Sequence, residues 1–213
     1  MRQKNILLLD YSTDRSETPA IKRWLPADAQ VTSLFIDTQE SFPSNLIDQG
    51  YTHVIHTGSA LSITNPAPFT ERALAFIQNA RDKGVLQMGI CYGHQLVCKA
   101  LVGDQAVRSS PNGLEAGWGP VTFTEKGMDL LAVRESEILW QHHFDEVTET
   151  PEGSQLLATN PVVTDGMIMF RDQHHLTATY AASLGPEIDR QLTALLNAWA
   201  SPGASPTASP SLP

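Results

Sequence analysis

A short segment of this chain, Gly89-Ile90-Cys91-Tyr92-Gly93, joins an expected strand to an expected helix. The apolar run 85–90 is typical of a buried strand, and residues 94–102 are typical of a helix. Glycines two positions before and after a central residue form a nucleophile elbow, because the turn leaves no room for β-carbons there. We therefore expect Cys91 to be held in a strained conformation at the carboxyl end of a sheet.

Short apolar runs alternate with helical patterns through the first half of the chain. The expected strands are 6–9, 31–36, 53–56 and 85–90, and the expected helices before the elbow are 20–24 and 66–81. Strands that alternate with helices predict an α/β fold, with a mostly parallel sheet and helices on both of its faces.

The pattern changes after about residue 103, where short β-rich runs follow one another between Gly, Pro and Asn turns. The expected strands are 117–124, 137–140, 155–158, 162–170 and 176–182, followed by a helix at 188–199. This half predicts an antiparallel elaboration of the sheet. Residues 201–213 are almost wholly Ser, Pro, Ala, Gly and Thr, which predicts a disordered tail after a single domain at 1–200.

Charge and cysteine content exclude several classes of function. The 213 residues carry a formal charge of -9, which disfavours binding to nucleic acid. No apolar run reaches the length of a membrane span or resembles a signal peptide, so we expect a cytoplasmic protein. Two cysteines cannot form a disulfide framework or a four-thiolate zinc site. We expect no metal, because the adjacent pairs His142-His143 and His174-His175 diverge on a strand.

The position of Cys91 predicts a reactive thiol. A helix N-terminus favours thiolate over thiol, and the backbone N–H of Tyr92 points toward an oxyanion formed by attack on a carbonyl. The glycine turn that contains Gly58 follows the expected strand 53–56 and can present a second N–H. The competing interpretation is a buried structural cysteine beside two ordinary glycines.

The segment 89–95, Gly-Ile-Cys-Tyr-Gly-His-Gln, resembles the nucleophile motif of class I (triad-type) glutamine amidotransferase domains, especially the GMP-synthase-like stand-alone members. Further resemblances occur in the family's order at 6–11, 57–62, 115–118 and 141–153. The resemblance covers about residues 5–199.

The resemblance implies a flavodoxin-like α/β fold that hydrolyses glutamine or a related amide through a Cys-His-Glu triad and needs no cofactor. Cys91 would be the nucleophile, and Gly58 and Tyr92 would supply the N–H groups of the oxyanion hole. Gln95 would help to seat the substrate. In the family, the ammonia passes to a synthetase domain or partner.

One part of the family's pattern is missing near the end of the chain. The family carries Gln-x-His-Pro-Glu, whereas residues 183–187 read Ser-Leu-Gly-Pro-Glu, so Gly185 stands at the histidine position and Glu187 is retained as the triad carboxylate. Because the leaving ammonia needs a proton donor, ordinary glutaminase activity is expected to be weak. His143 is the best substitute for the base, ahead of His94, His174 and His175.

Three hypotheses follow from these residues. The first is an amidotransferase-type cysteine hydrolase or acyl transferase with an incomplete triad. The second is a catalytically silent homologue that binds a small ligand or a partner enzyme and regulates it. The third, a cysteine hydratase or peptidase of the DJ-1-like group, fits less well, because residues 92–95 and 115–118 follow the amidotransferase pattern.

Overall fold

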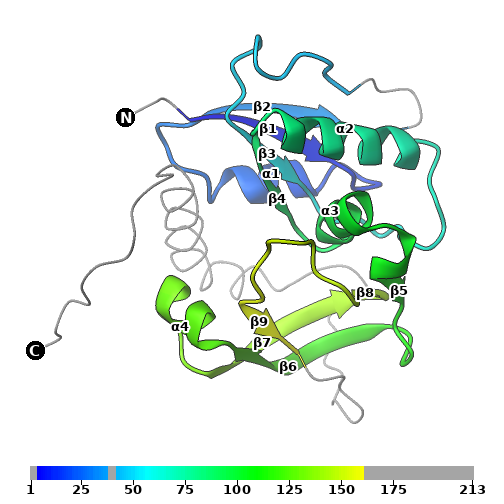
Figure 1. Ribbon diagram of the computed structural model, residues 1–213, viewed down its shortest axis with the longest axis vertical. Coiled ribbons are helices and arrows are strands. Elements are labelled where there is room, and N and C mark those ends of the chain that lie inside the picture. Colours follow the sequence, from blue (N-terminus) through cyan, green and yellow to red (C-terminus); the bar gives the residue numbers. More distant parts are fainter. Residues whose placement is uncertain (1–3, 38–41, 161–213) are drawn as a thin grey trace, which may run out of the picture.

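A parallel sheet forms the first half of the computed structural model, which describes residues 4–37 and 42–160 (Figure 1). Its four strands lie in the order β2-β1-β3-β4, and every neighbouring pair is parallel. The strands are β1 (Asn5–Asp10), β2 (Gln30–Phe35), β3 (His53–His56) and β4 (Leu86–Gly89). All four strands expected in this half are confirmed, with bounds that differ by at most a residue or two from the prediction.

Helices cover both faces of this sheet. Leu7 and Leu9 of β1 are buried in one cluster with residues of α2 and α3, whereas Ile6 and Leu8 are buried in a second cluster with Ile21 of α1. This division follows from the alternation of side chains along a strand. The helices are α1 (Glu17–Lys22), α2 (Thr70–Asp82) and α3 (Tyr92–Val102). None of the helices in the described ranges is long and apolar enough to cross a bilayer.

The helices differ from the prediction at their N-termini. The helix expected from residue 66 begins at Thr70, because Pro68 disfavours helical backbone at the residue before it. The helix expected at 20–24 instead spans Glu17–Lys22. The helix after the elbow begins at Tyr92, directly after the cysteine, two residues earlier than expected.

The second half contains antiparallel pairs, as expected, but they form two small sheets of their own in the described part of the chain. One has the order β7-β6-β9, and the other pairs β5 with β8. The strand expected at 155–158 is observed as the two-residue β9, and four short elements were not expected, namely η1, β5, β8 and α4. The elements are η1 (Asp104–Ala106), β5 (Val107–Ser109), β6 (Glu115–Phe123), α4 (Glu125–Leu131), β7 (Ser136–His143), β8 (Asp145–Val147) and β9 (Ala158–Thr159).

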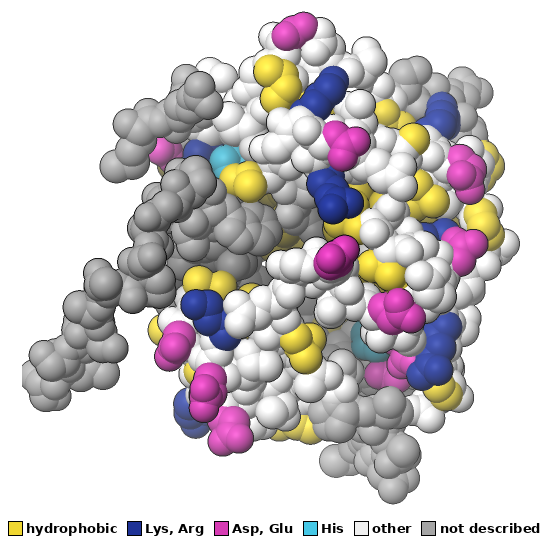
Figure 2. All heavy atoms as spheres, in the orientation of Figure 1, with side chains coloured by type: hydrophobic (Ala, Val, Ile, Leu, Met, Phe, Trp, Pro, Cys, Tyr) yellow, Lys and Arg dark blue, Asp and Glu magenta, His cyan; other side chains and the backbone are white. Residues whose placement is uncertain are grey.

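Several expectations lie outside the described residues: the strands 162–170 and 176–182, the helix 188–199 and the tail 201–213. On the face shown in Figure 2, acidic and basic side chains of the described residues are interspersed rather than segregated.

Candidate active site

Cys91 occupies a strained position between β4 and α3. Its backbone angles are φ 50° and ψ -111°, a conformation that L-residues rarely adopt. A β-carbon on Gly89 would lie 2.5 Å from the carbonyl oxygen of Gly93, and one on Gly93 would overlap the backbone oxygen of His56. The expected tight turn with two obligatory glycines is therefore confirmed.

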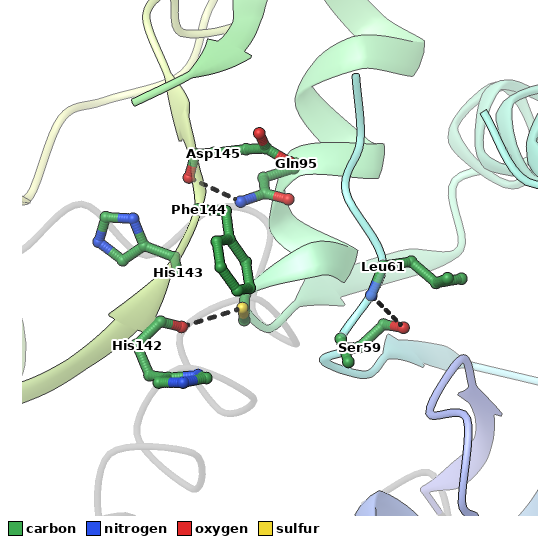
Figure 3. A pocket seen from close by; sticks show the side chains of 9 residues that line it. Ser59, Leu61, Gln95, His142, His143, Phe144 and Asp145 are labelled. Atoms are coloured by element: carbon green, nitrogen blue, oxygen red, sulfur yellow. Dashed lines mark hydrogen bonds between the residues drawn. The ribbon is translucent and has the colours of Figure 1, made fainter. Parts of the chain in front are cut away.

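The strained turn directs Cys91 outward into a pocket. Cys91 is exposed, whereas Cys98, seven residues later on the same helix, is buried. The pocket is enclosed by the loop after β3, the start of α3 and the junction of β7 with β8 (Figure 3). Its lining residues are Ser59, Ala60, Leu61, Cys91, Gln95, His142, His143, Phe144 and Asp145. A sulfur that opens onto a pocket excludes the interpretation of Cys91 as a buried structural residue.

The surroundings of the sulfur raise the pKa of the Cys91 thiol. Desolvation by the surrounding protein is the main cause, and the negative charges of Glu17 and Asp145 add to it. The thiol also lies 3.7 Å from the backbone oxygen of His142, to which it donates. The helix N-terminus acts on the sulfur in the expected direction through the N–H of Tyr92, but desolvation and two carboxylates outweigh it, so the net shift of the pKa is upward.

Two backbone N–H groups lower the pKa of the same thiol. Hydrogen bonds from the N–H groups of Tyr92 and Ser59 lower the pKa of Cys91 and partly offset its desolvation. Gly58 adjoins the cysteine, since a β-carbon on Gly58 would stand 3.6 Å from the β-carbon of Cys91. The turn 57–60 and the start of α3 thus meet at the sulfur, as expected. Sequence reasoning named Gly58 as donor and missed the next residue, Ser59.

A buried carboxylate, Asp145, fixes the far wall of the pocket. It accepts hydrogen bonds from the Ser62 hydroxyl (2.7 Å), the Ile63 backbone N–H (2.8 Å) and the Ser109 hydroxyl (3.1 Å). Its backbone oxygen accepts from Nε2 of Gln95 at 2.9 Å. Asp145 thereby joins the loop after β3 to β5, β8 and α3. Sequence analysis included residues 141–153 in the family resemblance but gave this aspartate no role.

His143 lies in the pocket lining, with its imidazole directed toward a carboxylate. Its Nε2 lies 3.5 Å from Oε2 of Glu115, its cross-strand neighbour on β6, and Glu115 also accepts from the Ser110 hydroxyl at 2.6 Å. Within the described part of the chain, Nδ1 of His143 is buried without a hydrogen-bond partner. In Figure 3 the ring points away from the contact between the sulfur and the His142 oxygen. A role for His143 as substitute base stays a prediction.

The remaining expected site residues are divided between the described and the undescribed parts of the chain. Gly185 and Glu187 lie outside the described residues, as do His174 and His175. Gln95 is buried in the pocket wall, and His94 lies with Nδ1 4.0 Å from the sulfur of Cys98. Among residues 4–37 and 42–160, no group of three or more His, Cys, Asp or Glu is arranged to hold a metal ion.

The family model described as class-I glutamine amidotransferase matches residues 25–176. A glutamine-hydrolyzing GMP synthase of Prochlorococcus marinus (strain MIT 9515) is 31% identical over 153 residues, which are 71% of this chain and 27% of that protein. A glutamine amidotransferase-like protein of Schizosaccharomyces pombe is 32% identical over 108 residues, 50% of this chain and 42% of that protein. The chain thus spans less than half the length of these curated relatives.

Two crystal structures share the fold. A glutamine amido transferase from Methylobacillus flagellatus superposes with a TM-score of 0.62 at 20% identity, covering 74% of this chain and 62% of that one. A glutamine amidotransferase from Thermotoga maritima gives 0.61 at 20% identity, covering 75% and 68%. These likenesses confirm the flavodoxin-like α/β fold. Since the family model matches more than half of the sequence, this chain belongs to the class-I glutamine amidotransferase family.

Proposed function

We propose that this chain hydrolyses the side-chain amide of glutamine, or of a related γ-glutamyl compound, through a thioester on Cys91. The observation that carries the proposal is the strained Cys91, whose sulfur opens onto a pocket where the N–H groups of Tyr92 and Ser59 converge. Such a turn is maintained against its conformational cost, which is typical of a functional site. Membership of the amidotransferase family supports the same chemistry.

The reaction has two halves. The sulfur forms a bond to the amide carbon, and the carbonyl oxygen becomes an oxyanion that the N–H groups of Tyr92 and Ser59 stabilise. Collapse of this intermediate breaks the C–N bond, and the nitrogen leaves as ammonia after it gains a proton. Water then attacks the thioester, which releases the carboxylic acid and restores the Cys91 thiol.

Ammonia is the product that a partner would use. Relatives of this chain are named as glutamine-hydrolyzing GMP synthases, and the chain spans 27% and 33% of the length of two of them. We therefore propose a synthetase partner that receives the ammonia, with the domain at 1–200 as the glutamine-hydrolysing part.

Ammonia release and intact mass test this proposal. The wild type, Cys91→Ser and Cys98→Ser are incubated with glutamine and with γ-glutamyl amides, and ammonia and covalent adducts are measured. Cys98→Ser is the matched control, because Cys98 is a buried cysteine on the same helix. We expect ammonia and an adduct with the wild type and Cys98→Ser, and neither with Cys91→Ser. Equal ammonia release by all three proteins would contradict the proposal.

A silent homologue is the second candidate, and Gly185 at the position of the triad histidine favours it. A protein of this kind would bind glutamine without consuming it and act on a partner enzyme. Calorimetry separates the two candidates, since the silent protein shows a binding heat but releases no ammonia. Gly185→His is the complementary variant, because a pocket that lacks only the triad histidine should gain glutaminase activity.

A further inference from the structure

A carboxyl group from the opposite part of the sheet lies beside the nucleophile. Glu17 is the first residue of α1, which follows β1, whereas Cys91 follows β4. The two meet at Gly58: a β-carbon on Gly58 would stand 3.6 Å from Oε2 of Glu17 and 3.6 Å from the β-carbon of Cys91. The Glu17 carboxyl group and the Cys91 β-carbon thus border the same side-chain-free position at Gly58, and the negative charge of Glu17 acts on the sulfur.

The loop that carries Glu17 is fixed by a buried aspartate. Asp10, at the end of β1, accepts hydrogen bonds from the backbone N–H and hydroxyl of Ser12 through Oδ1. Its other oxygen accepts from the backbone N–H of Thr18 at 3.0 Å and from the Thr18 hydroxyl at 2.5 Å. Because Thr18 is adjacent to Glu17, these bonds hold the Glu17 backbone at the carboxyl edge of the sheet.

Two carboxylates act on Cys91, and only one of them is available to move a proton. Asp145 already accepts three hydrogen bonds from Ser62, Ile63 and Ser109. Among the hydrogen bonds of the described residues, none uses the carboxyl group of Glu17. Burial and the nearby charges of Asp10 and Asp14 raise the pKa of Glu17, so that its carboxylate is a stronger base than that of an ordinary glutamate.

We propose that Glu17 is the proton acceptor and donor for Cys91, in the place of the triad histidine that Gly185 replaces in the sequence. This inference rests on the proposed function. As the sulfur bonds to the amide carbon, the thiol proton passes to the Glu17 carboxylate, directly or through one water. As the C–N bond breaks, Glu17 returns that proton to the departing nitrogen. Glu17 then takes a proton from the water that attacks the thioester, and that proton restores the Cys91 thiol.

The test compares Glu17→Gln, Glu17→Asp and Glu125→Gln with the wild type. Glu125→Gln is the matched control, because it makes the same change in the first turn of α4, which lies beside the sheet β7-β6-β9 rather than at the parallel sheet (Figure 1). Two quantities are measured: kcat for ammonia release from glutamine, and the pH midpoint of Cys91 alkylation by iodoacetamide, read by peptide mass. Circular dichroism confirms that each variant is folded.

We expect Glu17→Gln to lower kcat by about 10²–10⁴-fold, the usual contribution of general acid–base catalysis, with Glu17→Asp in between and Glu125→Gln unchanged. Glu17→Gln should also move the alkylation midpoint to lower pH, because it removes a negative charge that raises the pKa of Cys91. A role confined to holding the loop in place would not produce that shift, and the loss of kcat separates a proton carrier from a neighbouring charge.

The outcomes separate this inference from the proposed function. If the wild type releases ammonia through Cys91 and Glu17→Gln does the same at an equal rate, the role of Glu17 is overturned and the proposed function stands. If the wild type releases no ammonia, the proposed function fails. The alkylation profile then tests the contact alone: an unchanged midpoint in Glu17→Gln overturns the proposed role of Glu17, and a lowered midpoint supports the electrostatic contact between Glu17 and Cys91 on which that role depends.

Discussion

At Cys91, two kinds of neighbouring group shift the pKa of one thiol in opposite directions. The N–H groups of Tyr92 and Ser59 stabilise a thiolate, whereas desolvation and two carboxylates stabilise the neutral thiol. The second group prevails, so the pKa lies above its ordinary value. In the reaction proposed above, the Cys91 thiol would stay protonated until a base removes the proton, which differs from a cysteine that is permanently ionised.

This balance predicts slow alkylation of Cys91 at neutral pH. Since the thiolate is the reactive form, the rate with iodoacetamide should rise with pH and reach half of its maximum above the midpoint of an ordinary thiol. Cys98 is the internal comparison: its burial raises the pKa to about 11, so it should react at still higher pH. Peptide mass spectrometry after timed quenching measures both rates. A Cys91 midpoint at or below that of a free thiol would contradict the prediction.

At the scale of elements, one aspartate holds three segments of the site together. In Asp145→Asn, the negative charge that strengthens all three hydrogen bonds is lost, and the amide NH2 fits only opposite the Ser109 hydroxyl, which must turn from donor to acceptor. We expect a loss of about 1–3 kcal/mol in the free energy of unfolding and a fall in Cys91-dependent ammonia release. Asp129→Asn, on exposed α4, is the control and should change neither. Urea titration and the ammonia assay measure the two effects, and equal behaviour of the two variants would count against this role.

The two glycines closest to the nucleophile should respond differently to alanine. A β-carbon on Gly93 would overlap the backbone oxygen of His56, and neither α3 nor β3 can move without disturbing the core. We expect Gly93→Ala to cost about 3 kcal/mol or more and to lower the melting temperature by about 6 °C or more. Gly58→Ala makes only contacts of 3.6 Å and should stay within about 1 kcal/mol of the wild type. Thermal melts compare them, and similar losses in both would contradict the packing argument.

The elements that sequence predicts well are those whose signal is local. The strand 6–9 is a continuous apolar run, and its burial on both faces explains why the pattern was readable. The strand 53–56 has a weaker pattern, because Val54 and Ile55 stand between two buried histidines. The short strands β5 and β8 were missed, because three residues carry no measurable periodicity and form only when their partner is in place. Glu17 and Asp145 were missed for the same reason: their roles come from contacts with Gly58 and Ser62, far away in the sequence.

At the scale of the whole molecule, the first half of the chain encloses a buried histidine whose protonation at acid pH would destabilise the fold. His56 is fully buried on β3, with Nδ1 2.9 Å from the hydroxyl of Tyr11 and Nε2 3.0 Å from Oε1 of Gln87. Desolvation lowers its pKa to about 4, against an ordinary value of 6.5, although the hydrogen bond with Gln87 raises it in part. The fold therefore holds His56 neutral, and protonation of this ring is linked to unfolding.

This linkage predicts a loss of stability as the pH falls from about 6.5 to about 4. In that window the unfolded chain binds a proton at His56 and the folded chain does not, so the free energy of unfolding should fall by about 3 kcal/mol and then level off. Urea titrations at several pH values measure how the free energy of unfolding depends on pH. His56→Gln should remove the part of this dependence that His56 causes, however much the substitution destabilises the protein at neutral pH. The net charge of -9 declines equally in both proteins, so it cancels in the comparison. Parallel stability curves for the two proteins would show that His56 is not the group that titrates.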